Sequence, residues 1–542
     1  MATAVPGLGS LGRQAVERRP AAPPLVWVPA LLVAGAALLP IAYLIVRAAG
    51  ADEGIWLLLL SPRTFRLFIN TVLLGAAVAA TAILIAVPAA WLTVRTDLPG
   101  ASAWRVLTVM PLVVPSYVGA FVLITVLGPT GILQAALERL WGVTRLLDIY
   151  GFFGAWFTLS LFTYPYVLLS VRAGLRGIDP AIEEASRALG QSGWTTFRRV
   201  TLPLLRPSIG AGALLVLLYV FSDFGAVSMM QFDSFTTAIY LQYQASFNRS
   251  YAAALSLVLV ALTVLVVVLE GRQSRVRYHR IGSATARLPR RVHLGQWTRP
   301  ALLFLAAIAT VGVVMPVGVV TYWLVVGLRH GDSILVSLRP AINSITASVL
   351  SALLTVAAAM PVAVLSVRFR GRLSTAITRV SYAGYALPGI VVALSLVFFA
   401  ARYVVPLYQT LALLVFGYMI LFLPQALGPL RSALLQVSPA QEESARTLGR
   451  TAREVALTIT VPLARSGVVA GAALVFLTTM KELPATLLLS PIGFDTLATR
   501  VWSAATEGFF SRAAVPALLL LLASSLSVGL LLSQERNRWR DE

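Results

Sequence analysis

The stretch Asp179 to Pro203, DPAIEEASRALGQSGWTTFRRVTLP, occurs a second time as Ser438 to Pro462, SPAQEESARTLGRTAREVALTITVP. Both copies lie between long apolar runs. Asp179 or Ser438 can cap a helix that begins with proline, because the cap oxygen accepts a hydrogen bond from a free N–H and proline tolerates the first helical position. In the second copy we expect Gln441 to complete a capping box with Ser438. Each copy therefore predicts a short helix, a break and a return into an apolar segment.

The short helix of the first copy is predicted to have an apolar side and a charged side. Ile182, Ala185 and Leu189 follow helical spacing, and we expect the charged residues on the remaining surface. The helix should end near Gly190, which can take the left-handed conformation that closes a helix. The charged residues are Glu183, Glu184 and Arg187.

The spacing of the two copies resembles the cytoplasmic "EAA" loop of ABC importer permeases. Ser replaces one Ala in each triplet, and Val461 replaces the final Leu of the motif in the second copy. Two solvated charged loops are the alternative, but two copies in register, 259 residues apart, favour the motif. The resemblance implies that each loop contacts an ATPase subunit. The residues implicated are Glu183, Glu184, Ala185, Gly190 and Pro203 in the first loop and Glu442, Glu443, Ala445, Gly449 and Pro462 in the second.

The composition predicts an integral membrane protein. Hydrophobic residues make up 58% of the chain, charged residues only 12%, and the mean hydropathy is +0.83. The first apolar run is long for a signal peptide, so we expect an uncleaved helix. Stretches of about 20 apolar residues predict twelve spans, at residues 25–47, 68–94, 105–127, 150–171, 207–229, 251–270, 301–326, 343–367, 379–400, 406–428, 466–490 and 513–533.

The net charge of +21 would suggest a nucleic-acid partner in a soluble protein, but its distribution indicates topology here. Residues 271–300 carry eight arginines and no acidic residue. By the positive-inside rule this linker is cytoplasmic, and an even number of spans then places both termini and both repeated loops in the cytoplasm. We therefore expect a lipid bilayer around the chain and no nucleic acid.

The two halves of the chain are repeats beyond the loops. Six spans per half in the same orientation make parallel repeats. The distance in sequence between matching residues of the two halves falls from 273 to 259 along the chain. This difference of 14 residues predicts a longer outer loop around residues 128–149 in the first half. Asn70, Pro88, Arg95 and Pro115 match Asn343, Pro361, Arg368 and Pro388 at an offset of 273, and Pro165 and Arg172 match Pro424 and Arg431 at 259. The expected organisation is a cytoplasmic tail at 1–24, permease domains at 25–270 and 301–533, the basic linker at 271–300 and a second tail at 534–542.

The chain lacks the residues of an ATPase or a covalent catalyst. Its only lysine, Lys481, is followed by Glu482, so no phosphate-binding Gly-Lys-Ser/Thr loop exists. The three histidines form no ligand cluster and there is no cysteine, which excludes thiolate metal sites and disulfides. We predict no catalytic residue and no bound cofactor. The energy must come from a partner or from an ion gradient, and the latter would make the chain a secondary transporter.

Ionisable residues within predicted spans are candidates for the substrate pathway. Asp223 and Glu482 occupy equivalent places in the fifth and eleventh spans, with Lys481 beside Glu482. An ordinary ion pair or interfacial snorkelling is the alternative for Lys481 and Glu482. Asp233 and Asp495 follow and are expected at the outer mouth.

The segments around these residues resemble the fused permeases of ferric-iron ABC importers, and a thiamine importer permease is the second possibility. The resemblance implies an all-α fold of twelve transmembrane helices, in two parallel six-helix repeats of the type I (MetI-like) class, in a bacterial inner membrane. It also implies two ATPase subunits that use ATP and Mg²⁺, and an extracytoplasmic binding protein. Ferric iron would need hard oxygen ligands, which the carboxylates could supply.

Overall fold

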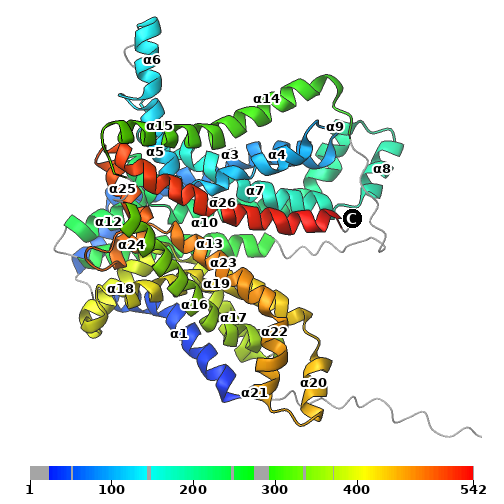
Figure 1. Cartoon of the computed structure of the whole chain (residues 1–542), viewed down its shortest axis with the longest axis vertical. Helices are drawn as coiled ribbons and strands as arrows, with labels where there is room; N and C mark the ends of the chain where they lie inside the picture. The colour runs from blue at the N-terminus through cyan, green and yellow to red at the C-terminus, as the bar shows by residue number, and fades with distance from the viewer. Residues whose placement is uncertain are drawn as a thin grey trace, which may run out of the picture.

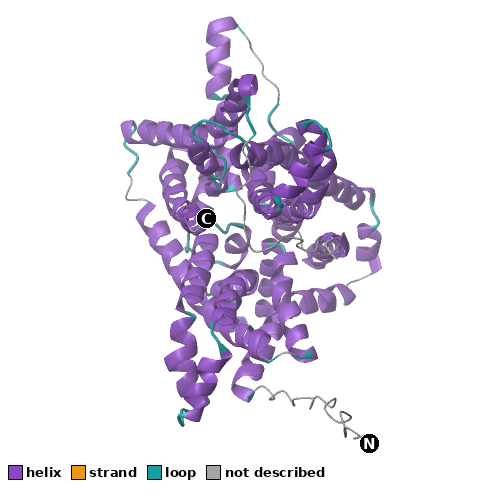
Figure 2. Cartoon of the chain, turned by 90° about the vertical axis from the view of Figure 1, so that its right-hand side faces the viewer, coloured by secondary structure: helices purple, strands orange, loops and turns teal. Residues whose placement is uncertain are grey.

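The computed structural model describes residues 23–50, 53–142, 148–245, 249–273, 292–333, 337–369 and 371–540. Over these residues the chain forms helices joined by loops, with an isolated bridge between Thr96 and Val292 (Figures 1 and 2). The expected N-terminal tail, most of the basic linker and part of the long outer loop lie outside the described residues. The residues of the expected C-terminal tail that the structure describes are helical, because α26 continues to Arg540.

Nine of the described helices are long and apolar enough to cross a membrane. The number becomes ten when the bent pair Arg372–Gly384 and Gly389–Tyr403 counts as one span. The expected count of twelve is not reached on this criterion, because the remaining apolar segments form shorter helices. These are Ala101–Val113, Arg465–Met480 and Phe510–Leu526.

The elements of the first half succeed one another without strands between them. In chain order they are α1 Pro24–Ala49, α2 Glu53–Leu59, α3 Pro62–Arg95, α4 Ala101–Leu107, η1 Met110–Val113, α5 Ser116–Leu127, α6 Ile132–Trp141, α7 Phe152–Gly177, α8 Pro180–Ala188, α9 Gly193–Thr196, the π-helix η2 Phe197–Thr201, α10 Leu202–Ser222, α11 Gly225–Met229, α12 Phe235–Ala245 and α13 Arg249–Gln273.

The second half repeats this order. Its elements are η3 Gly295–Trp297, α14 Thr298–Ala309, the π-helix η4 Thr310–Val314, α15 Met315–Arg329, α16 Leu338–Arg368, α17 Arg372–Ser381, η6 Tyr382–Ala386, α18 Gly389–Tyr403, η7 Val405–Leu407, α19 Leu411–Gln436, α20 Pro439–Thr447, α21 Ala452–Val455, the π-helix η8 Ala456–Thr460, α22 Val461–Leu463, α23 Arg465–Met480, α24 Pro484–Leu489, α25 Leu497–Thr506 and α26 Phe510–Arg540.

Four of the expected spans are interrupted, in matching pairs. The third and ninth break just before Pro115 and Pro388, which precede α5 and α18, because proline disfavours a helical residue before it. The fifth and eleventh were expected to run unbroken through Asp223 and Glu482. They instead end at Ser222 and Met480, and short helices α11 and α24 follow.

The first helix of each half packs on the other half. Helix α1 contacts α16, α17 and α18, while α15 contacts α5 and η4 contacts α7. The hydroxyl of Tyr43 donates to the Phe398 carbonyl at 3.2 Å, and Ser395 Oγ donates to the Pro40 carbonyl at 2.9 Å. The two halves are therefore interlocked by exchanged helices.

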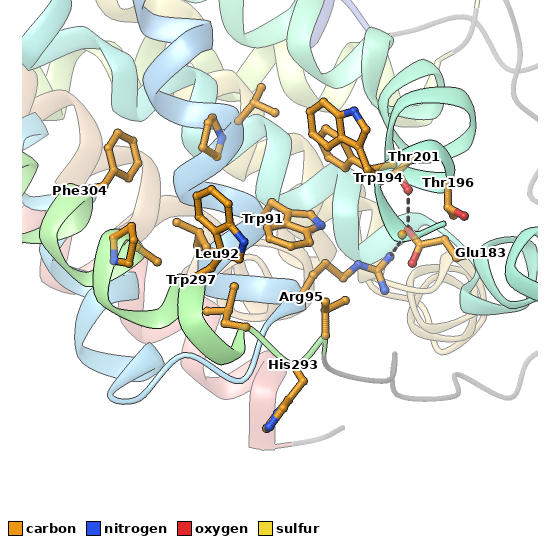
Figure 3. A pocket seen from close by; sticks show the side chains of 18 of the residues that line it. Trp91, Leu92, Arg95, Glu183, Trp194, Thr196, Thr201, His293, Trp297 and Phe304 are labelled. Carbon is orange, nitrogen blue, oxygen red and sulfur yellow. Dashed lines mark hydrogen bonds and ion pairs between the residues drawn. The ribbon is translucent and has the colours of Figure 1, made fainter. Parts of the chain in front are cut away.

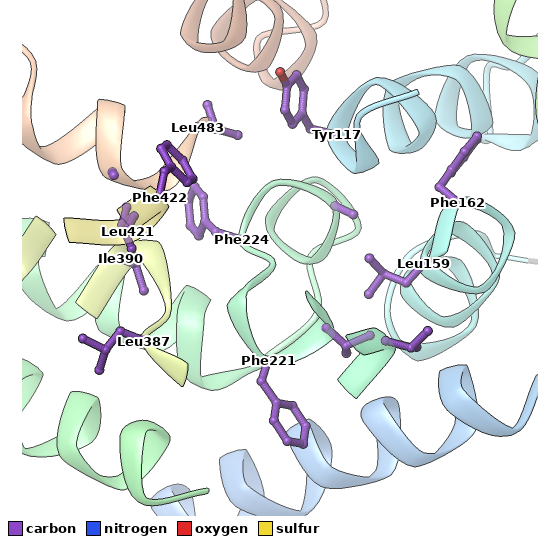
Figure 4. Close-up of a cluster of buried hydrophobic side chains, with 14 of the residues drawn as sticks. Tyr117, Leu159, Phe162, Phe221, Phe224, Leu387, Ile390, Leu421, Phe422 and Leu483 are labelled. Atoms are coloured by element: carbon purple, nitrogen blue, oxygen red, sulfur yellow. The ribbon is translucent and has the colours of Figure 1, made fainter. Parts of the chain in front are cut away.

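A single buried apolar cluster extends across both halves. Figure 4 shows part of it, with Phe221 and Phe224 of the first half and Leu387 and Leu483 of the second. In Figure 1 the short helices α8 and α20 both lie at the right-hand edge, whereas α12 and α25 lie at the left. The repeated loops and the predicted outer mouth thus occupy opposite ends of the molecule.

Candidate functional site: two loop clusters and a central carboxylate pair

Each repeated loop is held by an Arg-Glu-Thr cluster. In the first, Arg95 at the end of α3 is 3% exposed, and its Nη2 lies 3.7 Å from Oε1 of Glu183 on α8. Thr201 Oγ1, at the end of η2, donates to the same oxygen at 2.9 Å (Figure 3). Arg95 Nη2 also donates to the Leu175 carbonyl at 2.9 Å. The cluster therefore connects α3, α7, α8 and the start of α10.

The second cluster repeats the first at equivalent positions. Arg368 Nη2 at the end of α16 lies 2.9 Å from Glu442 Oε1 and donates to the Val437 carbonyl at 3.0 Å. Thr460 Oγ1, at the end of η8, donates to Glu442 Oε1 at 2.9 Å. Charge-assisted hydrogen bonds of this kind have about twice the strength of neutral ones. Both loop helices are thus tied to their own halves by the same three residue types.

The predicted loop residues divide into anchoring and exposed groups. Glu183 and Glu442 are half-buried in the clusters, whereas Glu184 and Glu443 are exposed. Ala185 is also exposed and Ala445 is buried. The apolar side of α8 is open to solvent, with Ile182 42% and Leu189 81% exposed, which leaves a surface for another protein.

The helix ends agree with the sequence except at one cap. Asp179 accepts from the Ala181 N–H at 2.9 Å, and Gly190 and Gly449 take the left-handed conformation, with φ of 81° and 85°. Pro203 and Pro462 lie in the first turns of α10 and α22.

The expected capping box of Ser438 and Gln441 is wrong, because the Ser438 side chain makes no cap hydrogen bond. A reciprocal pair forms instead at Thr451 and Glu454. Glu454 Oε2 accepts from the Thr451 N–H at 2.8 Å, and Thr451 Oγ1 accepts from the Glu454 N–H at 3.3 Å. The Thr451 backbone N–H lowers the pKa of the Glu454 carboxyl, because it stabilises the charged form.

In the first half, Asp223 interrupts the fifth span and begins the next helix. Its carboxylate accepts from the N–H groups of Ala226 at 2.9 Å and Val227 at 3.3 Å and from the Ser116 hydroxyl. The side chain is 7% exposed. These contacts satisfy free N–H groups at the start of α11, so the carboxylate has a structural role wherever else it acts.

In the second half, Glu482 likewise interrupts a span and caps the start of the next helix. Its Oε1 accepts from the Ala485 N–H at 3.1 Å at the start of α24, and its carbonyl accepts from Thr486 Oγ1 at 2.6 Å. Glu482 and the neighbouring Lys481 are both half-buried, and Lys481 makes no ion pair within the described part of the chain. Lys481 thus directly precedes Glu482 in the loop between α23 and α24.

Three aromatic side chains from both halves meet outside the carboxylates, and sequence reasoning did not assign them a role. Phe224 lies 4.6 Å from Tyr240 and 5.7 Å from Trp502, between ring centroids. Trp502 Nε1 donates to Ser228 Oγ of the other half at 3.0 Å. The cluster therefore joins α11 and α12 of the first half to α25 of the second.

Asp233 and Asp495 are exposed, at equivalent places before α12 and α25. The Asn70 side chain donates to the Asp233 carbonyl at 3.0 Å, and Asn343 donates to the Asp495 carbonyl at 2.9 Å. Asp495 also lies 3.9 Å from Arg500. The predicted pathway carboxylates thus differ in exposure, with Asp223 buried and Glu482 half-buried, whereas Asp233 and Asp495 are exposed. Among the described residues, no three His, Cys, Asp or Glu side chains form a metal site.

Comparison with known proteins places these features in a family context. The family described as "Binding-protein-dependent transport system inner membrane component" matches the chain twice, over residues 99–275 and 351–538. The Fe(3+)-transport system permease protein FbpB 2 of Haemophilus influenzae is 36% identical over 501 residues, 91% of this chain and 95% of the relative.

Two shorter relatives match part of the chain. The molybdenum transport system permease protein ModB of Escherichia coli is 29% identical over 223 residues, 39% of this chain and 96% of the relative. The sulfate transport system permease protein CysW of Synechococcus elongatus is 30% identical over 220 residues, 38% of this chain and 75% of the relative. Nearly the whole of ModB therefore corresponds to less than half of this chain, as expected for two joined permease units.

Proposed function

The chain belongs to the family of binding-protein-dependent transport system inner membrane components, and we propose that it carries ferric iron across the membrane as the permease of an ABC importer. The observation that supports ATP coupling best is the duplicated Arg-Glu-Thr cluster. It anchors α8 and α20 at one end of the molecule while leaving their outer surfaces exposed. Two equivalent docking helices suit two identical or similar ATPase subunits.

The proposed topology has twelve spans in two parallel six-helix repeats of the type I class. The nine long helices and the bent pair supply ten spans, and Arg465–Met480 and Phe510–Leu526 supply the other two. The segment Ala101–Val113 then joins α5 as one interrupted span. Both termini, both loops and the basic linker lie in the cytoplasm of a bacterial cell in this arrangement.

In the proposed cycle, ATP binding brings two partner ATPase subunits together and moves α8 and α20 with them. The clusters pass this displacement to α3 and α16, because their guanidinium groups hold both the loop helix and the end of the preceding span. The halves rock about their junction, the aromatic cluster of Phe224, Tyr240 and Trp502 separates, and an extracytoplasmic binding protein delivers its cargo.

Ferric iron is proposed because the relative that matches 91% of the chain is named as an Fe(3+) permease. Iron would be the substrate here. It would enter at the exposed Asp233 and Asp495, pass Asp223 and Glu482, and leave into the cytoplasm. An oxyanion is the second candidate, because the chain has a basic residue, Lys481, directly before Glu482 and two half-length relatives are named for molybdenum and sulfate transport.

Reconstitution tests the proposal directly. The permease would be assembled in proteoliposomes with its ATPase subunits and binding protein, and ATP-dependent uptake of radiolabelled ferric iron, molybdate and thiamine would be compared. We expect saturable iron uptake that requires all partners. Uptake driven by an imposed ion gradient without ATPase subunits would instead identify a secondary transporter.

A further inference from the structure

A cavity of about 830 Å³ lies at the loop end of the first half, and the proposed transport cycle gives a role only to the Arg95, Glu183 and Thr201 side chains of its lining. It lies between α3, the segment formed by α9 and η2, and the start of α14 (Figure 3). Its apolar wall includes Trp91, Phe197 and Phe304, and the exposed indoles of Trp194 and Trp297 stand at its edge. The cavity therefore combines a hydrophobic interior with an aromatic rim.

The aromatic side chains of this cavity pack on one another. Trp194 stacks on Phe197 with ring centroids 5.8 Å apart, and Trp91 meets Phe197 edge-on at 6.1 Å. Trp194 is 71% exposed and Trp297 is 72% exposed. Tryptophans are enriched at the level of lipid headgroups, and α3 ends here at Arg95. Their position fits the membrane interface.

Two arginines, Arg95 and Arg187, and one carboxylate, Glu183, are among the residues that line the cavity. Arg95 is paired with Glu183, and His293 contacts Asp97. Arg187 is exposed, lines the same cavity and has no ion pair among the described residues. Basic pockets between helices at the cytoplasmic side of membrane proteins bind the headgroups of anionic lipids.

The second half keeps the anchoring residues but not the aromatic wall. At the positions of Trp91, Trp194 and Phe197 it has Val364, Arg453 and Ala456. Arg187 has its counterpart in Arg446. The Arg-Glu-Thr cluster forms in the second half without these aromatic residues, so holding the loop helix does not require them.

We propose that this cavity binds one anionic phospholipid of the inner leaflet, with its phosphate near Arg187 and an acyl chain along Trp91, Phe197 and Phe304. The assignment to the inner leaflet rests on the proposed function, since that function places α8 in the cytoplasm. The lipid would fill the gap between α9 and α14 and support the first loop helix from behind. This makes the first half lipid-dependent and the second half independent of lipid at the equivalent place.

The test uses the purified full-length chain in mixed micelles, without transport partners. Phosphatidylglycerol brominated on its acyl chains is compared with equally brominated phosphatidylcholine as a quencher of tryptophan fluorescence. Subtracting the signal of a Trp91→Phe, Trp297→Phe double variant isolates quenching at the cavity. We expect half-maximal quenching at a fraction of phosphatidylglycerol that is about fivefold lower than the fraction of phosphatidylcholine required, because a basic residue near the bilayer surface attracts anionic lipid.

Arg187→Gln should abolish this preference, and Arg446→Gln is the matched control that should retain it. Circular dichroism and gel filtration verify that each variant is folded. Equal quenching by both lipids in the unmodified chain, or equal loss in the two arginine variants, would overturn the proposal. Loss of quenching when ATPase subunits are added would also overturn it, because the cavity would then belong to the subunit interface. Lipid binding is measured without transport, so a negative result in this assay can be distinguished from a failure of the proposed function.

Discussion

Gly389 faces Oε1 of Glu482 so closely that a Cβ atom at position 389 would lie 2.7 Å from that oxygen. In the first half the equivalent positions hold Ser116 and Asp223, whose side chains are joined by a hydrogen bond. The longer carboxylate is thus paired with the smaller residue. The two halves preserve the same helix cap by complementary changes in side-chain length.

The first prediction follows from this packing. Gly389→Ala should displace the Glu482 carboxylate and weaken the start of α24, lowering ATP-driven uptake about tenfold, as a cost of about 1.4 kcal/mol would. Uptake in proteoliposomes and thermal unfolding of the purified chain measure the two effects. Ser116→Ala removes a hydrogen bond without adding bulk and should have a smaller effect. Full uptake by Gly389→Ala would show that the carboxylate can move without consequence.

A second prediction concerns the loop clusters. Arg368→Gln leaves Glu442 and the Val437 carbonyl without their cation, at a cost of about 1–3 kcal/mol for a group that loses its partner. We expect ATP hydrolysis to continue while uptake falls, because α20 no longer moves with α16. Arg95→Gln should behave alike in the first half, and the exposed Arg372→Gln serves as a control. Parallel loss of hydrolysis and uptake would argue against a coupling role.

The exposed glutamates of the loops supply a third prediction. The double variant Glu184→Ala, Glu443→Ala should uncouple hydrolysis from uptake and lower the affinity for the ATPase subunits, because both residues lie on the open surface of the loop helices. Pull-down of the subunits and paired assays of hydrolysis and uptake measure this. The permease should still insert and unfold at the unmodified temperature. Retention of full transport would count heavily against docking at these residues.

The central carboxylates lead to a fourth prediction. Asp223→Asn keeps a side-chain oxygen that can cap α11, and Glu482→Gln does so for α24, so both variants should fold. If the negative charges assist a cation, iron uptake should fall while hydrolysis stimulated by the binding protein persists. Unchanged iron uptake in the double variant would limit both residues to capping. Saturable uptake of thiamine but not iron would change the substrate.

A fifth prediction concerns the pH dependence of the contact between Asp97 and Leu294 at the loop end of α3. The Leu294 N–H donates to Asp97 Oδ1 at 3.0 Å, and this contact lowers the pKa of the Asp97 carboxyl, with a further lowering from His293. When the pKa of a carboxyl is lower in the folded state than in the unfolded state, its contact stabilises the fold at pH values above the unfolded-state pKa of about 3.9. This stability is lost as the pH falls through the folded-state pKa.

Hydrogen exchange at the Leu294 amide should therefore stay slow near neutral pH and lose its protection only below about pH 4. Asp97→Asn should show reduced protection already at pH 7. Exchange at the Thr451 amide, which Glu454 holds, is an internal comparison that Asp97→Asn should leave unaltered. Equal protection at Leu294 in both proteins would exclude the contact as an anchor.

Local signals in the sequence predicted the helical loops well. Asp179, Gly190 and Gly449 act through their own turns, so their conformations could be read from residue type and position. The cap predicted at Ser438 does not form, and the structure gives no reason for this, whereas Thr451 and Glu454 form a reciprocal pair at the start of the next helix. The pairing of Arg95 with Glu183 could not be predicted, although the repeat of Arg95 in Arg368 marked a position of interest.

The interruptions at Asp223 and Glu482 show a second limit of predicting the structure from the sequence. A carboxylate inside an apolar stretch has the same sequence signature whether it faces a pathway or caps a new helix. Only the arrangement of the following N–H groups distinguishes these cases. The aromatic cluster of Phe224, Tyr240 and Trp502 likewise depends on contact between halves that lie far apart in the sequence.

The exchange of first helices sets an order of events during biosynthesis. Helix α1 leaves the ribosome roughly 290 residues before α16 begins, which at about 5–20 residues per second corresponds to a delay of roughly 15–60 seconds. During that interval α1 has its partner α13 but not α16, nor Phe398 and Ser395 of α18, to which its hydrogen bonds run. Native packing of the earliest helix is thus completed late in assembly, and a chain truncated before α16 would leave α1 without its partners α16, α17 and α18.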